Sequence, residues 1–146
     1  MSEKKILLFG AGLVTEPLVK YLLDVPEFKL TIATLNIERA EELVSGHANG
    51  AAIEFNIEDE AVLENLVKDH DLSISLLPAS MHPIVARACL KFKKNLLTSS
   101  YVSPEMKAFD EEAKANGLLF LNELGLDPGI DHMSAMRVIH AVENRG

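Results

Sequence analysis

Short apolar runs rich in Ile, Leu and Val alternate along the chain with longer segments in which apolar residues recur at helical spacing. This alternation is typical of βα units, in which helices bury both faces of a parallel sheet. We therefore expect an α/β fold, a doubly wound parallel sheet of about six strands with helices on both faces. The pattern predicts strands at residues 5–10, 29–34, 51–56, 72–77, 96–99 and 118–122, and helices at 16–24, 37–45, 60–68, 83–92, 104–115 and 132–143.

The predicted helix boundaries carry the usual start and stop residues. Pro17 and Pro104 fall where a first helical turn tolerates proline, and Gly46 and Gly117 fall where a helix ends with a positive φ. Repeats, low-complexity tracts and linkers are absent from the sequence, so residues 1–146 are expected to fold as one domain. The last predicted helix would have no second domain to face, and we expect a C-terminal substrate domain that this chain lacks.

Composition narrows the classes of partner. The chain has 146 residues and a formal net charge of −8, which argues against nucleic acid and anionic membrane surfaces, because both attract an excess of Lys and Arg. The single cysteine, Cys89, lies in an apolar run and is predicted to be a buried thiol. The charged start at Glu3 and the short apolar run after it resemble neither a signal peptide nor a membrane span, so a cytoplasmic location is expected.

A glycine turn follows the first predicted strand. Gly10 permits a tight turn, and Gly12 leaves no side chain between the backbone and a phosphate at the start of the next helix. The turn predicts a Rossmann domain that holds the pyrophosphate of NAD or NADP. Thr15 occupies the third position of the G-x-G-x-x-G pattern and weakens the motif. A glycine-rich strand end without a ligand is the alternative.

The choice between NAD and NADP stays open from the residues alone. An Asp or Glu at the end of the second strand indicates NAD, and a nearby Arg indicates NADP, but this strand ends Thr34-Leu35-Asn36. Arg39 lies one helical turn further on. It is placed either to reach a 2′-phosphate or to pair with Glu42 or Glu38 on the helix surface.

Three later stretches are more distinctive than the glycine turn. SLLPxxxHPxVAxxC begins at Ser75, TxSYVSP at Thr98 and ELGLDPGIDHM at Glu123, all behind GAGLVxxP at Gly10. In this order they closely resemble the N-terminal coenzyme-binding domain of the glutamate-forming saccharopine dehydrogenases, or saccharopine reductases. The resemblance covers nearly the full chain.

This resemblance implies an oxidoreductase of lysine metabolism. Such an enzyme takes a hydride from the lysine-side carbon of saccharopine with NAD or NADP, and hydrolysis of the imine gives L-glutamate and 2-aminoadipate 6-semialdehyde; the reverse is reductive condensation. Fungal members carry an arginine at the end of the second strand, whereas the stretch from Thr34 to Asn36 is more similar to the bifunctional plant and animal enzymes, which use NAD. The resemblance therefore leans toward NAD. It also allows a homodimer through the missing domain, and it implies that this chain alone is inactive.

The resemblance and the glycine turn together assign site residues. Ser100, Tyr101 and Asp127 would face the substrate, with Asp127 and Tyr101 as the catalytic pair. Asn56 stands where the family often has Asp, which removes a charge near the adenine. Coenzyme contacts are expected at Gly10, Ala11, Gly12, Leu13, Val14, Thr34, Leu35, Asn36, Asn56, Ile57, Leu77, Pro78, Ala79, Ser80, Leu126, Asp127 and Pro128.

Each singled-out residue also has a structural interpretation. Asp127 begins an Asp-Pro-Gly tight turn, but beyond a strand end its carboxylate could pair with the secondary amine of saccharopine or accept its proton. Tyr101 either caps the core or donates to substrate. His82 either approaches the nicotinamide or donates to a backbone carbonyl, and Asp131 is predicted to cap the last helix. The histidines form no cluster at metal-ligand spacing, so no metal is predicted: His47, His70 and His140.

Three hypotheses follow. The chain is the coenzyme domain of an oxidoreductase, whose missing domain supplies arginines for the carboxylates of saccharopine, or it is a free-standing dinucleotide-sensing module without catalysis. The third is an unrelated small-substrate dehydrogenase that shares only the fold. The first two hypotheses make different predictions about one surface of the domain. An enzyme domain should expose apolar residues beyond the carboxyl ends of its strands, where the absent domain would pack.

Overall fold

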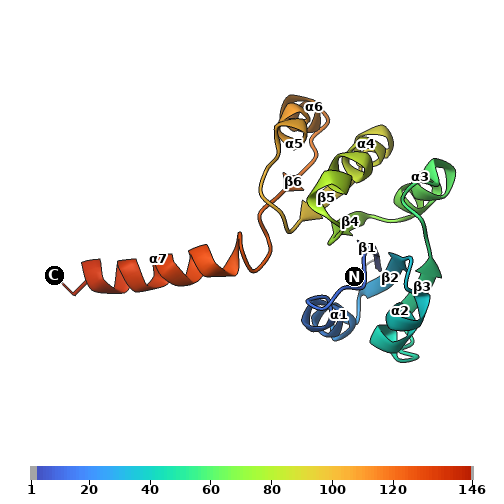
Figure 1. Cartoon of the computed structure of the whole chain (residues 1–146), viewed down its shortest axis with the longest axis horizontal. Helices are drawn as coiled ribbons and strands as arrows, with labels where there is room; N and C mark the ends of the chain where they lie inside the picture. Colours follow the sequence, from blue (N-terminus) through green and yellow to red (C-terminus); the bar gives the residue numbers. More distant parts are fainter. Residues whose placement is uncertain (1–2, 146) are drawn as a thin grey trace.

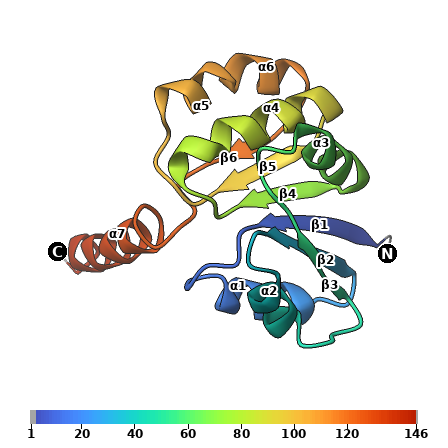
Figure 2. The same cartoon turned by 45° about the vertical axis from the view of Figure 1, so that its right-hand side comes forward.

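The computed structural model describes residues 3–145 and contains one six-stranded sheet (Figure 2). The strands lie in the order β3-β2-β1-β4-β5-β6, and every neighbouring pair is parallel. This is the doubly wound topology that the alternating pattern predicted, and the fold prediction is confirmed. The strands are β1 Lys4–Phe9, β2 Phe28–Thr34, β3 Gly50–Glu54, β4 Leu72–Ser75, β5 Asn95–Thr98 and β6 Phe120–Leu121.

Helices cover both faces of the sheet, as predicted. The two helices α1 (Glu16–Leu23) and α2 (Ile37–Val44) pack on one face, and the other face is covered by four later helices (Figure 2). The chain thus changes face after β3, and this change positions the site described below. The remaining helices are α3 Glu60–Asp69, η1 Ala79–Met81, α4 His82–Phe92, α5 Pro104–Ala108, α6 Asp110–Ala115 and α7 Ile130–Glu143.

The alternation of side chains along β1 builds the two halves of the core. Ile6 and Leu8 point into the cluster under α1 and α2, whereas Leu7 and Phe9 point into the cluster under α3 and α4. Successive strand residues face opposite sides of a sheet, so a strand buried on both faces must be apolar throughout. Cys89 is fully buried in the second cluster, and this burial raises its thiol pKa to about 12. The prediction of a buried thiol is confirmed.

Two predicted elements differ most from the observed ones. The helix expected at 104–115 is divided at Phe109, whose backbone N–H donates to the Met106 carbonyl at 3.2 Å in a tight i−3 turn. Phe109 thereby packs against the core. The last strand spans two residues rather than five, because β6 pairs with β5 only at Phe120 and Leu121.

Asp131 does not cap α7 as predicted. The helix begins two residues earlier than predicted, at Ile130, with Gly129 in the cap position at a φ of 141°. That conformation is open to glycine and costly for other residues, so the chain enters the helix at the glycine. The Asp131 carboxylate lies in the first turn and accepts the Gly129 backbone N–H at 2.9 Å.

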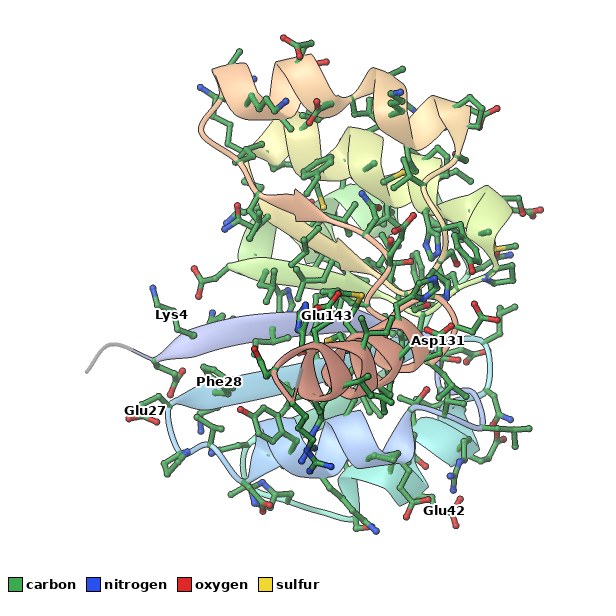
Figure 3. All side chains as sticks on the ribbon, turned by 90° about the vertical axis from the view of Figure 1, so that its left-hand side faces the viewer. Lys4, Glu27, Phe28, Glu42, Asp131 and Glu143 are labelled. Carbon is green, nitrogen blue, oxygen red and sulfur yellow. The ribbon has the colours of Figure 1, made fainter. Side chains whose placement is uncertain are left out.

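The last helix, α7, extends away from the sheet (Figure 1), and none of its residues is buried. Figure 3 shows its side chains as sticks, with Asp131 near its start and Glu143 at its end. Several large apolar side chains of α7 are exposed, so this helix contributes little to the core. No helix within residues 3–145 is long and apolar enough to cross a membrane. The exposed apolar residues of α7 are Ile130, Met133, Met136, Val138, Ile139 and Val142.

Candidate active site

All loops that carry predicted site residues leave the carboxyl ends of the strands and meet at one edge of the sheet. The central strands β1 and β4 are neighbours, yet the chain after β1 runs to α1 on one face and the chain after β4 runs to α4 on the other. The two loops therefore diverge and leave a crevice between them. In open α/β sheets ligands bind at such a switch point.

The loop after β1 is built to receive an anion. Gly10 has a φ of 100°, and a Cβ at this position would lie 3.2 Å from the Leu76 carbonyl oxygen of the neighbouring loop. A Cβ at Gly12, in contrast, would meet nothing within 4 Å. Within residues 3–145 the backbone N–H groups of residues 11–14 donate no hydrogen bond. Free N–H groups at the start of α1, beside open space at Gly12, fit the pyrophosphate of a dinucleotide.

Thr15 fills the place of the third glycine. Its side chain is fully buried under α1, and its backbone N–H donates to the Gly12 carbonyl at 3.2 Å. The third glycine of the pattern allows close packing of helix on strand. Here a fully buried threonine stands in that position, at the start of α1.

Next to the glycine turn lies an open cleft of about 990 Å³. It brings together residues from the loops after β1, β4, β5 and β6 that are far apart in the sequence. Eight of the predicted site residues line it: Leu13, Val14, Ala79, Ser100, Tyr101, Leu126, Asp127 and Pro128.

The remaining predicted coenzyme residues lie outside this cleft. Asn36 caps α2 by accepting the Arg39 backbone N–H at 3.0 Å, and Asn56 accepts the Glu58 backbone N–H at 3.0 Å. Ile57 lines a second cavity of about 400 Å³ between α3 and α4. These residues follow β2 and β3, on the side of the crevice where the strand order places an adenosine half. The others outside the cleft are Gly10, Ala11, Gly12, Thr34, Leu35, Leu77, Pro78 and Ser80.

Arg39 is held between two carboxylates. Its guanidinium contacts Glu42 at 2.6 Å and Glu16 of α1 at 3.3 Å, and its side chain remains 29% exposed. Pairing with Glu42 was one of the two alternatives drawn from the sequence, whereas Glu38 is not a partner. Arg39 nevertheless stands in the first turn of α2, the helix that follows the end of β2, and the ribose of a dinucleotide binds at that strand end in this fold.

Tyr101 and Asp127 form a direct pair at the cleft. The Tyr101 hydroxyl donates to the Asp127 carboxylate at 2.7 Å, and this hydrogen bond raises the pKa of Tyr101. Both side chains are exposed, and the Asp127-Pro128 peptide bond is cis. Asp127 can therefore form the tight turn expected from the sequence and still present its carboxylate at the cleft, as its predicted role requires. The structure brings together the two residues that the sequence named as the catalytic pair.

His82 does not donate to a backbone carbonyl, one of the two alternatives drawn from its sequence position; its approach to the nicotinamide stays a prediction. The imidazole is 2% exposed, and its two nitrogens lie 2.9 Å from the Ser75 hydroxyl and 2.8 Å from the Ser100 hydroxyl. The ring therefore contacts no backbone carbonyl and faces no open surface. Burial lowers the pKa of His82, which favours the neutral imidazole.

A second ionisable group lies at the start of α7. His132 pairs with the Asp131 carboxylate at 2.8 Å, and this contact raises the pKa of His132. Each of Asp127, Asp131 and His132 offers one ligand atom within 4.8 Å of the others. All three are exposed, and Asp131 already accepts hydrogen bonds from His132 and Gly129. The prediction that the chain binds no metal stays a prediction.

Sequence analysis missed half of the cleft lining. Most of these residues are apolar, and an apolar residue beside a strand end has no pattern that separates a pocket wall from core. Gly125 does carry a signal, because it lies inside the ELGLDPGIDHM stretch; a Cβ there would come within 2.6 Å of the Ser99 carbonyl oxygen. The missed residues are Pro17, Leu18, Leu76, Ser99, Leu124, Gly125, Ile130 and Met133.

With the crevice, the glycine turn and the Tyr101–Asp127 pair in place, comparison with known proteins identifies the family. Residues 6–121 match the saccharopine dehydrogenase NADP binding domain. The chain belongs to this family. The resemblance drawn from the three sequence stretches is thereby confirmed.

Members of the family from several kingdoms align with nearly the whole chain. The L-glutamate-forming, NADP(+) saccharopine dehydrogenase of Schizosaccharomyces pombe is 41% identical over 97% of this chain and 31% of that protein. The mitochondrial alpha-aminoadipic semialdehyde synthase of Bos taurus is 37% identical over 99% of this chain and 16% of that protein. The chain therefore spans less than a third of these two relatives.

A solved structure shows the same fold. The apo L-Glu-forming saccharopine dehydrogenase from Saccharomyces cerevisiae superposes with a TM-score of 0.85 and 33% identity, over 97% of this chain and 32% of that one. At this identity the agreement concerns the family as well as the fold.

Proposed function

We propose that this domain binds a nicotinamide dinucleotide in the crevice and forms one wall of a saccharopine site. The parent activity would interconvert saccharopine with L-glutamate and 2-aminoadipate 6-semialdehyde. The observation that carries the proposal is the Tyr101–Asp127 pair, which stands at the cleft beside the loop of free N–H groups at residues 11–14. Family membership supplies the substrate class.

Asp127 is proposed as the acid-base group. Its carboxylate can pair with the protonated secondary amine of saccharopine and accept its proton, while the Tyr101 hydroxyl holds that carboxylate in place. The bound dinucleotide would supply the chemistry of hydride transfer at the neighbouring carbon. Apolar side chains around the pair, such as Leu13 and Leu126, would exclude water when the cleft is filled.

NADP is the coenzyme that we propose. The family description and the name of the Schizosaccharomyces pombe relative both specify NADP, which does not support the expectation of NAD drawn from the stretch at Thr34. The end of β2 has no Asp or Glu whose carboxylate would repel a 2′-phosphate. Arg39, partly exposed in the first turn of the helix that follows that strand end, is the cation that would meet it.

The site is incomplete without further cationic groups. Saccharopine carries several carboxylates, yet no Lys or Arg from the described part of the chain lines the cleft. Carboxylates are best recognised by guanidinium groups. We therefore propose that a substrate domain, within the part of the relatives that makes them at least three times longer than this chain, supplies them, and that this chain alone binds coenzyme without turning over substrate.

The exposed apolar surface favours the enzyme over a free-standing sensor. Ile130 and Met133 of α7 line the cleft, and further large apolar side chains of α7 beyond them are exposed. Contiguous exposed apolar residues at a ligand site indicate a surface that another protein part covers. A homodimer through that part and a cytoplasmic location stay predictions.

Expression of the full reading frame tests the proposal. Incubation with saccharopine and either coenzyme should produce NADPH faster than NADH, followed by absorbance, together with L-glutamate. The Asp127→Asn variant is the matched control, because it keeps the size of the side chain and the Tyr101 contact but removes the base. Absence of coenzyme reduction by the unmodified enzyme would overturn the assignment.

A further inference from the structure

A buried histidine links the cleft to the interior of the sheet. The His82 Nε2 atom lies 2.8 Å from the Ser100 hydroxyl, and its Nδ1 atom lies 2.9 Å from the hydroxyl of Ser75, the last residue of β4. Ser75 is fully buried, whereas Ser100 lines the cleft. The three side chains thus form one hydrogen-bonded chain with a single end that ligand can reach.

Each ring nitrogen of His82 has a serine hydroxyl as its hydrogen-bond partner, and each of these hydroxyls can donate or accept. A neutral imidazole has one donor and one acceptor nitrogen, which matches two serine partners without adding charge to the interior. Because Ser75 is enclosed, the chain has no outlet through which a proton could leave. Its effect must therefore be to fix the position of Ser100 rather than to conduct protons.

The backbone at Ser100 is held as well. The Glu123 backbone N–H donates to the Ser100 carbonyl at 3.1 Å, and the Glu123 carboxylate accepts the Val102 backbone N–H at 3.2 Å. Backbone and side chain of Ser100 are thus both anchored, and the residue after it, Tyr101, holds Asp127. The orientation of the Ser100 hydroxyl is consequently coupled to the geometry of the acid-base pair.

We propose that His82 is a positioning residue, which holds the Ser100 hydroxyl as a fixed hydrogen-bond partner for the polar group of the substrate beside Asp127. The inference rests on the proposed function. It assigns a role to His82, whose side chain lies outside the cleft and which the proposed acid-base chemistry does not itself require. A fixed partner lowers the cost of ordering the site when substrate binds.

Two substitutions at His82 separate the two contacts. In His82→Gln the side-chain amide reaches the place of Nε2 and keeps the bond to Ser100, whereas in His82→Asn it reaches only the place of Nδ1 and keeps the bond to Ser75. In the full-length enzyme we expect His82→Asn to lower kcat/KM for saccharopine about tenfold and His82→Gln to lower it less than about threefold. Loss of packing alone would also rank Asn below Gln, because Asn leaves the larger cavity, so the two roles are separated by the double-mutant cycle with Ser100→Ala described next.

A double-mutant cycle with Ser100→Ala completes the test. If His82 acts through Ser100, then His82→Asn should change kcat/KM by less than about twofold in the Ser100→Ala background. Equal losses with and without the Ser100 hydroxyl would overturn the proposal, as would equal kcat/KM in His82→Asn and His82→Gln. Melting temperatures measured on all variants identify any that fail to fold.

A spectroscopic readout on this chain is independent of saccharopine turnover. Nitrogen NMR of the His82 ring should show a change at Nε2 and little change at Nδ1 when Ser100 is replaced by Ala, and the opposite for Ser75→Ala. An unchanged Nε2 resonance in Ser100→Ala overturns the positioning role whatever the enzyme does. A shifted Nε2 resonance in an enzyme that does not oxidise saccharopine supports the contact and overturns the proposed function alone.

Discussion

The Tyr101 hydroxyl donates a 2.7 Å hydrogen bond to the Asp127 carboxylate across two neighbouring strand ends. Tyr101 follows β5 and Asp127 follows β6, so the pair depends on the parallel pairing of Leu96 with Phe120 and of Leu97 with Leu121. The carboxylate is thereby held at the cleft by a partner that carries no charge.

Removal of that partner should slow catalysis more than it weakens coenzyme binding. Tyr101→Phe deletes one hydrogen bond to a charged group, and we expect kcat/KM for saccharopine in the full-length enzyme to fall about 10- to 100-fold. The coenzyme dissociation constant should stay within about twofold. Tyr21→Phe, at an exposed tyrosine on α1, is the control. Unchanged kcat/KM in Tyr101→Phe would contradict the role of the pair.

A carboxylate at Gly12 should abolish most coenzyme binding without harming the fold. The space beside Gly12 is open and its φ is not positive, so Gly12→Asp should leave the free energy of unfolding nearly unchanged. Repulsion between the new charge and the pyrophosphate should raise the dissociation constant about 30-fold or more. Gly12→Asn, with the same shape and no charge, should raise it less. Equal constants for Asp and Asn measured by calorimetry would remove charge repulsion as the cause.

Gly10 should behave in the opposite way. Its φ of 100° and the 3.2 Å approach of a Cβ to the Leu76 carbonyl make Gly10→Ala costly to the fold itself. We expect a loss of about 1–3 kcal/mol in the free energy of unfolding, measured by urea denaturation. A variant as stable as the natural chain would show that the loop relaxes.

Arg39 should set the preference for NADP over NAD. We expect Arg39→Ala to weaken NADP binding about tenfold and to leave NAD binding unchanged, because a guanidinium recognises the 2′-phosphate that only NADP carries. Glu42→Gln removes a competing carboxylate and should strengthen NADP binding. Titration calorimetry of both coenzymes checks this prediction. If Arg39→Ala weakens the binding of NADP and NAD equally, the guanidinium does not bind the 2′-phosphate.

Two buried histidines should make the fold less stable in mild acid. Burial lowers the pKa of His70 and of His82 below the ordinary value of 6.5, so the unfolded chain takes up protons first and the free energy of unfolding falls as the pH drops below about 6.5. His70→Gln should flatten this slope in urea denaturation between about pH 5 and pH 8. His132, whose pKa is raised, acts in the opposite direction in every variant alike.

The order of strands and helices could be predicted from the sequence because a sheet buried on both faces produces a simple pattern of apolar residues. The alternation of Ile6 and Leu8 with Leu7 and Phe9 requires apolar residues throughout a central strand. Gly46 and Gly117 adopt the positive φ values expected at helix ends. Tyr101 and Asp127 were identifiable because the family resemblance singled them out, and their places beyond the fifth and sixth predicted strands put them at one edge of a parallel sheet.

Contacts between distant side chains were decided only by the tertiary structure. The sequence could not place His82 between Ser75 and Ser100, because that contact depends on how α4 turns relative to β4 and β5. Likewise, the start of α7 at Gly129 depends on a φ of 141° that no local pattern demands. Local periodicity therefore determined which segments are strands and helices, while the packing of those segments determined which polar groups meet, because a hydrogen bond requires atoms within about 3 Å and the sequence fixes no such distance.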